Sequence, residues 1–422
     1  MTLFGPLICA LAITSSAASA KAIIKKHEHV KHEKKQRLRA LSDVAAQSMP
    51  TTTAVEAEPI WFSTGYKYPL KCGEGTELSA DGWSCEVNPC LAEFIEKSEK
   101  YLLPDGDSSY AFVFTKGFYT FNNLEACGFC DSIDGLAVGS GGGGARIGGG
   151  GGAGGAYERC GVDIKNVDKI EIEVGAGGAG GDGDNSPVNQ GYSGERSFIK
   201  FFNGGTRVER IEGAGGGGGD RDQSNGEDGM PVITSDPPTN LHGQGGGGGG
   251  AGRIGPRPGG DGGDGVGGGT DGFPGGTGSA GDASAGGAGS GEDGKDATNA
   301  CGISQEEEEQ ELPSSCSGLQ GGDGGRGTKP ALASCAKDVG LITTDSVAAG
   351  GGGAGKNGGG DGGDGIGGNG GMELNDSPNW ICTAGMDNTG SGGGGGIDPN
   401  LNGPACAGAN GLVVIKFKKC GH

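Results

Sequence analysis

Four aspartates in two short glycine repeats have the type and spacing to bind a metal ion. Asp261 and Asp264 lie in GGDGGDGVG, and Asp361 and Asp364 lie in GGDGGDGIG. Both stretches match the calcium nonapeptide GGxGxDxUx, whose carboxylates suit a hard cation. That mechanism shares each ion between adjacent turns, whereas the two copies lie 100 residues apart. Calcium is therefore possible at these residues, and solvated aspartates on a glycine helix are the favoured interpretation.

Cysteine offers the second kind of chemistry. Beyond Cys9 there are twelve cysteines, an even number that most simply forms six disulfides in an oxidising compartment. Their spacing does not fix the pairing. Cys127 and Cys130 form a C-x-x-C pair, for which a structural disulfide is favoured over redox or zinc chemistry. The disulfide candidates are Cys72, Cys85, Cys90, Cys127, Cys130, Cys160, Cys301, Cys316, Cys335, Cys382, Cys406 and Cys420.

The remaining polar motifs do not assemble a catalytic group. Outside residues 27–32, only His242 and His422 are histidines, so a Ser/His/Asp or Cys/His arrangement is hard to build. We therefore expect no enzyme activity. Asn375 begins a glycosylation sequon, weakened by the proline at 378. The acidic run 306–309 is expected to be an exposed loop between two cysteines.

The first fifty residues read as targeting and linker sequence. An apolar run, Leu3 to Ile13, and the small residues Ala18-Ser19-Ala20 predict a signal peptide at residues 1–20. The apolar run itself is too short to span a bilayer. Residues 21–55 are expected to be a basic pro-segment or linker. Segment 21–43 carries +5 and the rest of the chain −26, which argues against nucleic acid as a partner. We expect a secreted protein without a transmembrane segment.

Residues 56–105 are expected to form a small cysteine-containing module with one helix. Asn88 and Pro89 predict a capped helix start, and the helix must stop before Pro104. Residues 110–121 read as two β-prone runs around Thr-Lys-Gly, which predicts a hairpin.

Residues 106–422 are expected to form a glycine-rich domain framed by short strands. Strand-like stretches lie at 133–138, 162–174, 197–202 and 207–211, and GLVVIKFKK near the end predicts a last strand. Between them the chain is largely glycine, which supplies 101 of the 422 residues. Such a chain cannot build a core of ordinary density over its whole length.

Glycine can still support a fold if the backbone itself packs. Polyglycine II helices have three residues per turn and no internal hydrogen bonds, so neighbouring helices can pair their backbone groups when no Cβ lies between them. Glycine must then recur at every third residue, as it does from Gly269 to Gly281 and from Gly359 to Gly371. Collagen is excluded because the runs are short, their phase slips and proline is scarce. We therefore predict a mainly β and irregular fold with little α-helix, in which strands frame a layer of packed polyglycine II helices stapled by disulfides.

Several stretches together resemble a known domain family. A hairpin, an apolar strand entering a glycine block (IDGLAVGSGGGG), a strand ending in VGAGGAG, a strand with Ser-Phe (GERSFIKF) and the closing GANGLVVIKF follow in order between residues 112 and 417. This order resembles the glycine-rich domain of phage tail-fibre adhesins and bacterial surface proteins. It is more distantly similar to the glycine-rich extracellular region of anaplastic-lymphoma-kinase-type receptors. The resemblance implies a polyglycine II sandwich carried on β-structure.

These observations favour a secreted structural or adhesive protein that presents a rigid glycine-rich surface to an extracellular surface, matrix or protein ligand. Two alternatives remain. One is a soluble ligand-recognition domain related to the receptor regions, and the other is an ice-binding protein, against which the sparse Thr270 and Thr277 argue.

Overall fold

The fold was described from a computed structural model of the chain. Residues 70–422 form one contact unit, which contains every described residue. Residues 1–55, the acidic run 306–309 and Asn375 lie outside the described ranges. The structure describes residues 76–78, 85–87, 89–102, 109–124, 129–146, 148–181, 190–220, 226–232, 240–251, 254–257, 259–265, 269–280, 283–299, 319–356, 358–372, 382–396 and 406–419.

Two five-stranded sheets form the β part of the molecule. Sheet I has the order β3 (Lys100–Leu102), β4 (Ser109–Phe114), β16 (Leu412–Lys419), β6 (Phe129–Val138) and β7 (Ala156–Asp163). Sheet II has the order β11 (Asn240–Gln244), β10 (Thr206–Gly213), β9 (Ser197–Asn203), β8 (Lys169–Val174) and β5 (Gly117–Asn122). Neighbouring strands are antiparallel except β10 and β11, which are parallel. Two-stranded pairs join β1 (Thr76–Leu78) to β2 (Cys85–Val87), β12 (Ile254–Arg257) to β13 (Gly278–Ala280) and β14 (Thr298–Asn299) to β15 (Leu319–Gln320).

An aromatic and aliphatic core lies between the two sheets. In β8 the residues Ile170, Ile172 and Val174 point into this core while the alternating charged residues face outward, as the alternation predicts. Helix α2 (Pro89–Lys97) closes one side of the core with Phe94, whose ring stacks on Phe121 with centroids 3.8 Å apart. The helix and the sheets therefore share one hydrophobic core.

A second apolar cluster covers the other face of sheet I. Helix α3 (Ala333–Asp338) contributes Ala333 and Ala336, which pack with Val113, Leu136 and Val414 of the sheet. Sheet I is consequently buried on both faces, and this explains why the closing stretch LVVIKF is apolar at successive positions rather than at alternate ones.

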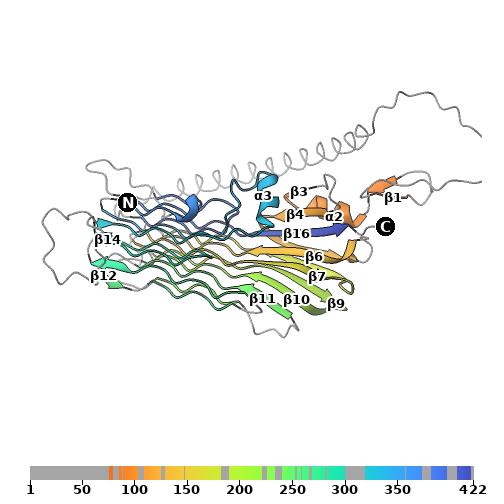
Figure 1. Cartoon of the computed structure of the whole chain (residues 1–422), viewed down its shortest axis with the longest axis horizontal. Coiled ribbons are helices and arrows are strands. Elements are labelled where there is room, and N and C mark those ends of the chain that lie inside the picture. Colours follow the sequence, from red (N-terminus) through yellow and green to blue (C-terminus); the bar gives the residue numbers. More distant parts are fainter. Residues whose placement is uncertain are drawn as a thin grey trace, which may run out of the picture. The chain divides into compact units, whose positions relative to one another are not determined.

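The strands run directly into the glycine segments. Figure 1 shows β6, β7, β9, β10 and β16 at one side and the undulating glycine chain extending from them. Strand β6 ends at Val138 and segment 139–145 follows, while segment 148–155 returns into β7. The sandwich thus sets the starting position and direction of each glycine segment.

The glycine segments pack around one central segment, residues 148–155. Its backbone N–H groups donate to three neighbouring segments, and its carbonyl oxygens accept from three others. The hydrogen bonds to any one neighbour recur at every third residue. For example, Gly149, Gly152 and Gly155 all donate to segment 213–220. The three acceptor segments are 213–220, 283–290 and 390–396, and the three donor segments are 139–145, 245–251 and 346–355. This pattern is the hexagonal packing of threefold helices, and the φ and ψ of Gly362, −67° and 141°, lie in the polyproline II region.

A ring of outer segments surrounds these six inner segments. Each outer segment hydrogen-bonds to an inner one through its backbone, and the ring comprises residues 175–181, 190–196, 226–232, 259–265, 269–277, 291–297, 320–328, 358–364, 366–372, 382–386 and 406–411. The predicted mainly β fold with little helix and packed glycine helices is confirmed, and the packing extends in three directions rather than in one layer.

Three local predictions need correction. The threefold run from Gly359 to Gly371 is not one helix, because the chain reverses at η3 (Gly363–Gly365), where Asp364 and Gly365 have φ of 48° and 69°. The predicted hairpin at 110–121 is wrong, since β4 and β5 belong to different sheets. The turn residue Gly117 has φ of +92° and lets the chain cross between the sheets. Finally, the apolar stripe Leu91, Phe94, Ile95 and Leu102, which the sequence predicts for the helix near Pro89, is not all helical, because α2 ends at Lys97 and Leu102 lies in β3.

Candidate binding surface

Most glycine positions inside the bundle leave no room for a side chain. A Cβ added to Gly151 in the central segment would lie 2.1 Å from the carbonyl oxygen of Gly142, and most other glycines of the bundle show similar clashes with backbone atoms. The inner segments carry small buried side chains at their other positions, such as Ala153 in the central segment and Ser284, while the exposed side chains lie mainly on the outer segments. These outward rows form the candidate binding surface.

Two kinds of outward row occur on the bundle. Segments 226–232, 259–265 and 358–364 have exposed aspartates, among them Asp228, Asp261 and Asp361. Segments 175–181 and 406–411 instead expose alanines. Tyr192, with 48% of its surface exposed, is the largest exposed side chain of segment 190–196. The surface thus has an acidic part and an uncharged part.

The aspartates have a structural role that the sequence did not reveal. Asp228 Oδ1 accepts a hydrogen bond of 2.8 Å from the backbone N–H of Asp261 on the next segment. Asp323 does the same for Asp361 at 2.9 Å. An outer segment has N–H groups without an inner neighbour, and these carboxylates supply the missing acceptors.

The four predicted calcium ligands are not brought together. Asp361 and Asp364 take part in different contacts. The backbone N–H of Asp361 donates to Asp323, whereas Asp364 Oδ2 accepts from the N–H of Gly327 and from Ser346 Oγ. Asp261 and Asp264 are exposed on a different segment, 259–265. Within the described ranges, no three Asp, Glu, His or Cys side chains converge on one point. The geometry therefore favours the backbone-capping interpretation of these residues.

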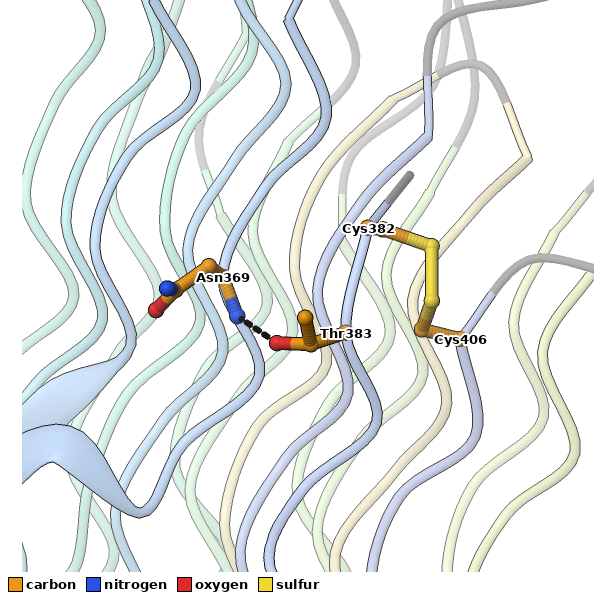
Figure 2. The surroundings of a disulfide bond; sticks show 4 residues. All are labelled: Asn369, Cys382, Thr383 and Cys406. Carbon is orange, nitrogen blue, oxygen red and sulfur yellow. Dashed lines mark hydrogen bonds between the residues drawn. A yellow bond between two sulfur atoms is a disulfide. The ribbon is translucent and has the colours of Figure 1, made fainter. Parts of the chain in front are cut away.

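One predicted disulfide is present between outer segments. Cys382 and Cys406 are joined with their Cα atoms 5.8 Å apart. Figure 2 shows this bond next to Thr383, whose hydroxyl accepts a 2.7 Å hydrogen bond from the backbone N–H of Asn369. The disulfide and this hydrogen bond tie together three consecutive outer segments of the ring, 366–372, 382–386 and 406–411.

The other disulfide candidates divide into two groups. Cys335 is a buried thiol in α3, packed in the cluster on sheet I, and burial raises the pKa of this thiol. Cys160 is exposed on β7, and its sulfur lies 3.9 Å from Glu158 Oε1. Neither cysteine is joined to another described cysteine, so the disulfide expectation stays a prediction at these two positions. For Cys85, Cys90 and Cys130 only the backbone is described, in β2, α2 and β6, and Cys72, Cys127, Cys301, Cys316 and Cys420 lie outside the described residues.

A partly buried charged cluster joins the edges of the two sheets, and no local sequence pattern indicates it. Arg159 on β7 pairs through Nε with Glu209 Oε1 on β10 at 2.8 Å, and its Nη1 contacts Nε2 of His242 on β11. Burial raises the pKa of Glu209, while Arg159 and His242 partly oppose this shift. The cluster cross-links the sandwich, and only the fold brings together residues that lie 50 and 83 positions from Arg159.

Fold and surface together define a β-sandwich protein that carries a hexagonal bundle of polyglycine II helices. Residues 116–328, half of the chain, match the glycine-rich domain family, and the chain belongs to this family. No curated protein matches the sequence. The match covers strands β5 to β15 and the central segment. Neither α2 nor α3 has the length and apolar character needed to cross a bilayer, among the helices that the structure describes.

Proposed function

We propose that this chain is a secreted, non-enzymatic structural or adhesive protein whose glycine bundle presents a rigid surface to an extracellular surface, matrix or protein ligand. The observation that carries the proposal is the complete set of six hydrogen-bonded neighbours around segment 148–155. A lattice held by its own backbone fixes the outward side chains in position, so the surface loses little entropy on contact with a partner.

Three further observations support this function. The signal sequence predicted at residues 1–20 and the Cys382–Cys406 disulfide both suit an oxidising extracellular compartment. The outward rows repeat at every third residue, which is about 9 Å along a threefold helix, and such a repeat suits a partner that is itself extended or repetitive. The resemblance to phage and bacterial adhesin domains points to the same class of function.

Secretion and surface binding are tested in two steps. The full chain, and a version lacking residues 1–20, are expressed in a cell line with a secretory pathway, and the culture medium is assayed for the protein. Only the full chain is expected in the medium. The secreted protein is then passed over extracellular matrix and over intact cells. Retention supports an adhesive role, whereas passage through both without binding contradicts it.

A matched pair of charge reversals locates the binding surface. Asp264→Lys changes an exposed position of the acidic rows that caps no neighbouring N–H in the described residues. Lys116→Glu changes an exposed position between β4 and β5, away from the bundle. If the bundle makes the contact, Asp264→Lys alters retention and Lys116→Glu does not. Equal effects of the two variants would exclude the bundle as the contact surface.

A further inference from the structure

The outer ring of the bundle has two kinds of position. An edge position hydrogen-bonds to two inner segments, and a corner position hydrogen-bonds to one. Five of the six inner segments carry a corner segment of this chain. These corner segments are 175–181 on 139–145, 259–265 on 245–251, 291–297 on 283–290, 358–364 on 346–355 and 382–386 on 390–396. The sixth inner segment, 213–220, has no corner partner among the described segments.

The hydrogen bonds of segment 213–220 show where its corner lies. Ala214 donates to Gln244 at the end of β11, and Gly217 and Asp220 donate to segment 245–251, which follows it. Gly216 and Gly219 donate to segment 139–145. Because donors rotate by a third of a turn per residue, the N–H groups of Gly215 and Gly218 point in the third direction. That direction lies between the edge segments 190–196 and 226–232. We name this position the Glu227 corner, after the side chain found there.

Glu227 makes the contacts that a backbone carbonyl of a corner segment would make. Its Oε2 accepts from the N–H of Gly218 at 3.3 Å and from Ser193 Oγ at 2.6 Å. Its Oε1 accepts from Gln190 Nε2 at 2.8 Å. The carboxylate therefore satisfies one of the two donors of segment 213–220 that point into the corner.

The other backbone groups of the Glu227 corner have no partner within the described part of the chain. Gly215 is buried, and its N–H has no acceptor there. The carbonyl oxygens of Gly191 and Gly194 accept from no described N–H. These two carbonyl oxygens lie next to Gly215 and Gly218, whose N–H groups point into the corner. A Cβ added to Gly215 would lie 2.0 Å from Gly194 O, and a Cβ added to Gly218 would lie 2.0 Å from Gly191 O. Donors and acceptors are both spaced by three residues, as an added threefold strand requires.

Two of the five occupied corners share a sequence pattern that fits such a position. Segment 259–265 reads GGDGGDG and segment 358–364 reads GGGDGGD, and both sit in corners. Their glycines face the bundle without a Cβ, and every third residue, an aspartate, faces outward. Two stretches of the chain directly precede residues of the Glu227 corner. They are GDNSPVNQ before residue 191 and RDQSN before residue 226, and neither has this pattern.

We propose that the Glu227 corner binds a Gly-Gly-Xaa strand of a partner chain, which completes the sixth corner of the bundle. The strand's carbonyls accept from Gly215 and Gly218, its N–H groups donate to Gly191 and Gly194, and the Glu227 carboxylate moves out to solvent. This site is distinct from the outward rows of the proposed function. The peptide experiment below can therefore fail while the protein is still retained on matrix or cells, and retention can fail while the peptide still binds.

The test uses the full chain and a capped nonapeptide of three Gly-Gly-Asp repeats, titrated by calorimetry. Glu227→Gly removes the competing carboxylate and is expected to bind the peptide at least about tenfold more tightly than the unchanged protein. The matched control is Glu195→Gly, which removes a carboxylate on segment 190–196 that caps Ala176 on the other side. It is expected to bind as the unchanged protein does. A Gly-Ala-Asp repeat, whose methyl groups would face the bundle, is expected not to bind.

A second measurement keeps the proposal testable if Glu227→Gly does not fold. Saturating Gly-Gly-Asp peptide is expected to slow hydrogen exchange at Gly215 and Gly218 in the unchanged protein, and to leave segment 390–396 unaffected. Three results would overturn the proposal: unchanged exchange at Gly215, equal affinity of folded Glu227→Gly and Glu195→Gly, or equal binding of the Gly-Ala-Asp peptide. In each case Glu227 simply closes the bundle at this corner.

Discussion

Substituting one central glycine by alanine is the sharpest test of the backbone lattice. Gly151 lies in the central segment 148–155, and an added Cβ would be 2.1 Å from Gly142 O and 2.6 Å from its carbonyl carbon. Ordinary contacts begin at 3.4 Å, so segment 139–145 would have to move by about 1.3 Å. Its other neighbours prevent that movement, because Gly393 donates to the same Gly142 oxygen at 3.0 Å.

The cost of Gly151→Ala follows from the contacts that this displacement breaks. The three bonds at risk are Gly142 N to Gly152 O, Gly393 N to Gly142 O and Gly151 N to Gly393 O. At about 1 kcal/mol each, with about 1–3 kcal/mol for overpacking, the loss is about 4–6 kcal/mol. The lower entropy of the unfolded alanine chain returns about 0.4–1 kcal/mol. We therefore expect the free energy of unfolding to fall by about 4 kcal/mol, a large part of the total for a typical domain.

Chemical denaturation followed by circular dichroism measures this loss, and a second glycine supplies the control. At Gly358, the nearest atom to an added Cβ is Gln320 Cγ at 3.7 Å, and φ is not positive. Gly358→Ala is therefore expected to change stability by less than about 1 kcal/mol. If Gly151→Ala unfolds at the same denaturant concentration as Gly358→Ala, the central segment is not packed as described, and the hexagonal lattice is refuted.

Three further predictions address the disulfide, a buried acid and the thiols. Replacing both Cys382 and Cys406 by serine removes a link between residues 24 positions apart and is expected to lower the free energy of unfolding by about 3 kcal/mol; a double variant that melts like the unchanged protein would contradict this. Burial raises the pKa of Glu209 above its ordinary 4.5, so the folded state favours the protonated acid, and stability should fall as the pH rises through the interval just above 4.5. Glu209→Gln should remove that slope, and parallel pH–stability curves for the two proteins would argue against it. A maleimide should label the exposed Cys160 in the native protein and the buried Cys335 only after denaturation; equal labelling rates would show that α3 does not cover Cys335.

Much of the β framework could be predicted from the sequence because its signals are local. The alternation in KIEIEV and the apolar run LVVIKF identify β8 and β16 directly. Strand β11, NLHGQ, has no such pattern and was missed. It becomes a strand because segments 213–220 and 245–251 run parallel in the bundle, which aligns β11 with β10. The hairpin prediction failed because two adjacent β-prone runs do not show which sheet each one joins.

The surface was less predictable because its contacts are not local in sequence. A glycine at every third position predicted close backbone packing without a Cβ between the helices, and this is confirmed at most glycines of the bundle, although the inner segments also carry small buried side chains such as Ala153 and Ser284. Nothing in the sequence indicates that Asp323 caps Asp361, 38 positions away, or that Glu227 faces Ser193. Those pairs depend on which segments become neighbours, and neighbours are set by the order in which the chain fills the hexagonal positions.

The rotation of donors by a third of a turn per residue also limits how this chain can change in length. Inserting one residue within segment 148–155 would turn every later N–H of that segment toward the wrong neighbour, so Gly154 would no longer face Gly390. Inserting three residues restores all directions and lengthens the segment by one turn of about 9 Å. Relatives of this protein should therefore differ by multiples of three residues inside the glycine segments and by any number in the connecting loops. The threefold rotation of the backbone thus restricts which insertions and deletions the glycine segments can tolerate.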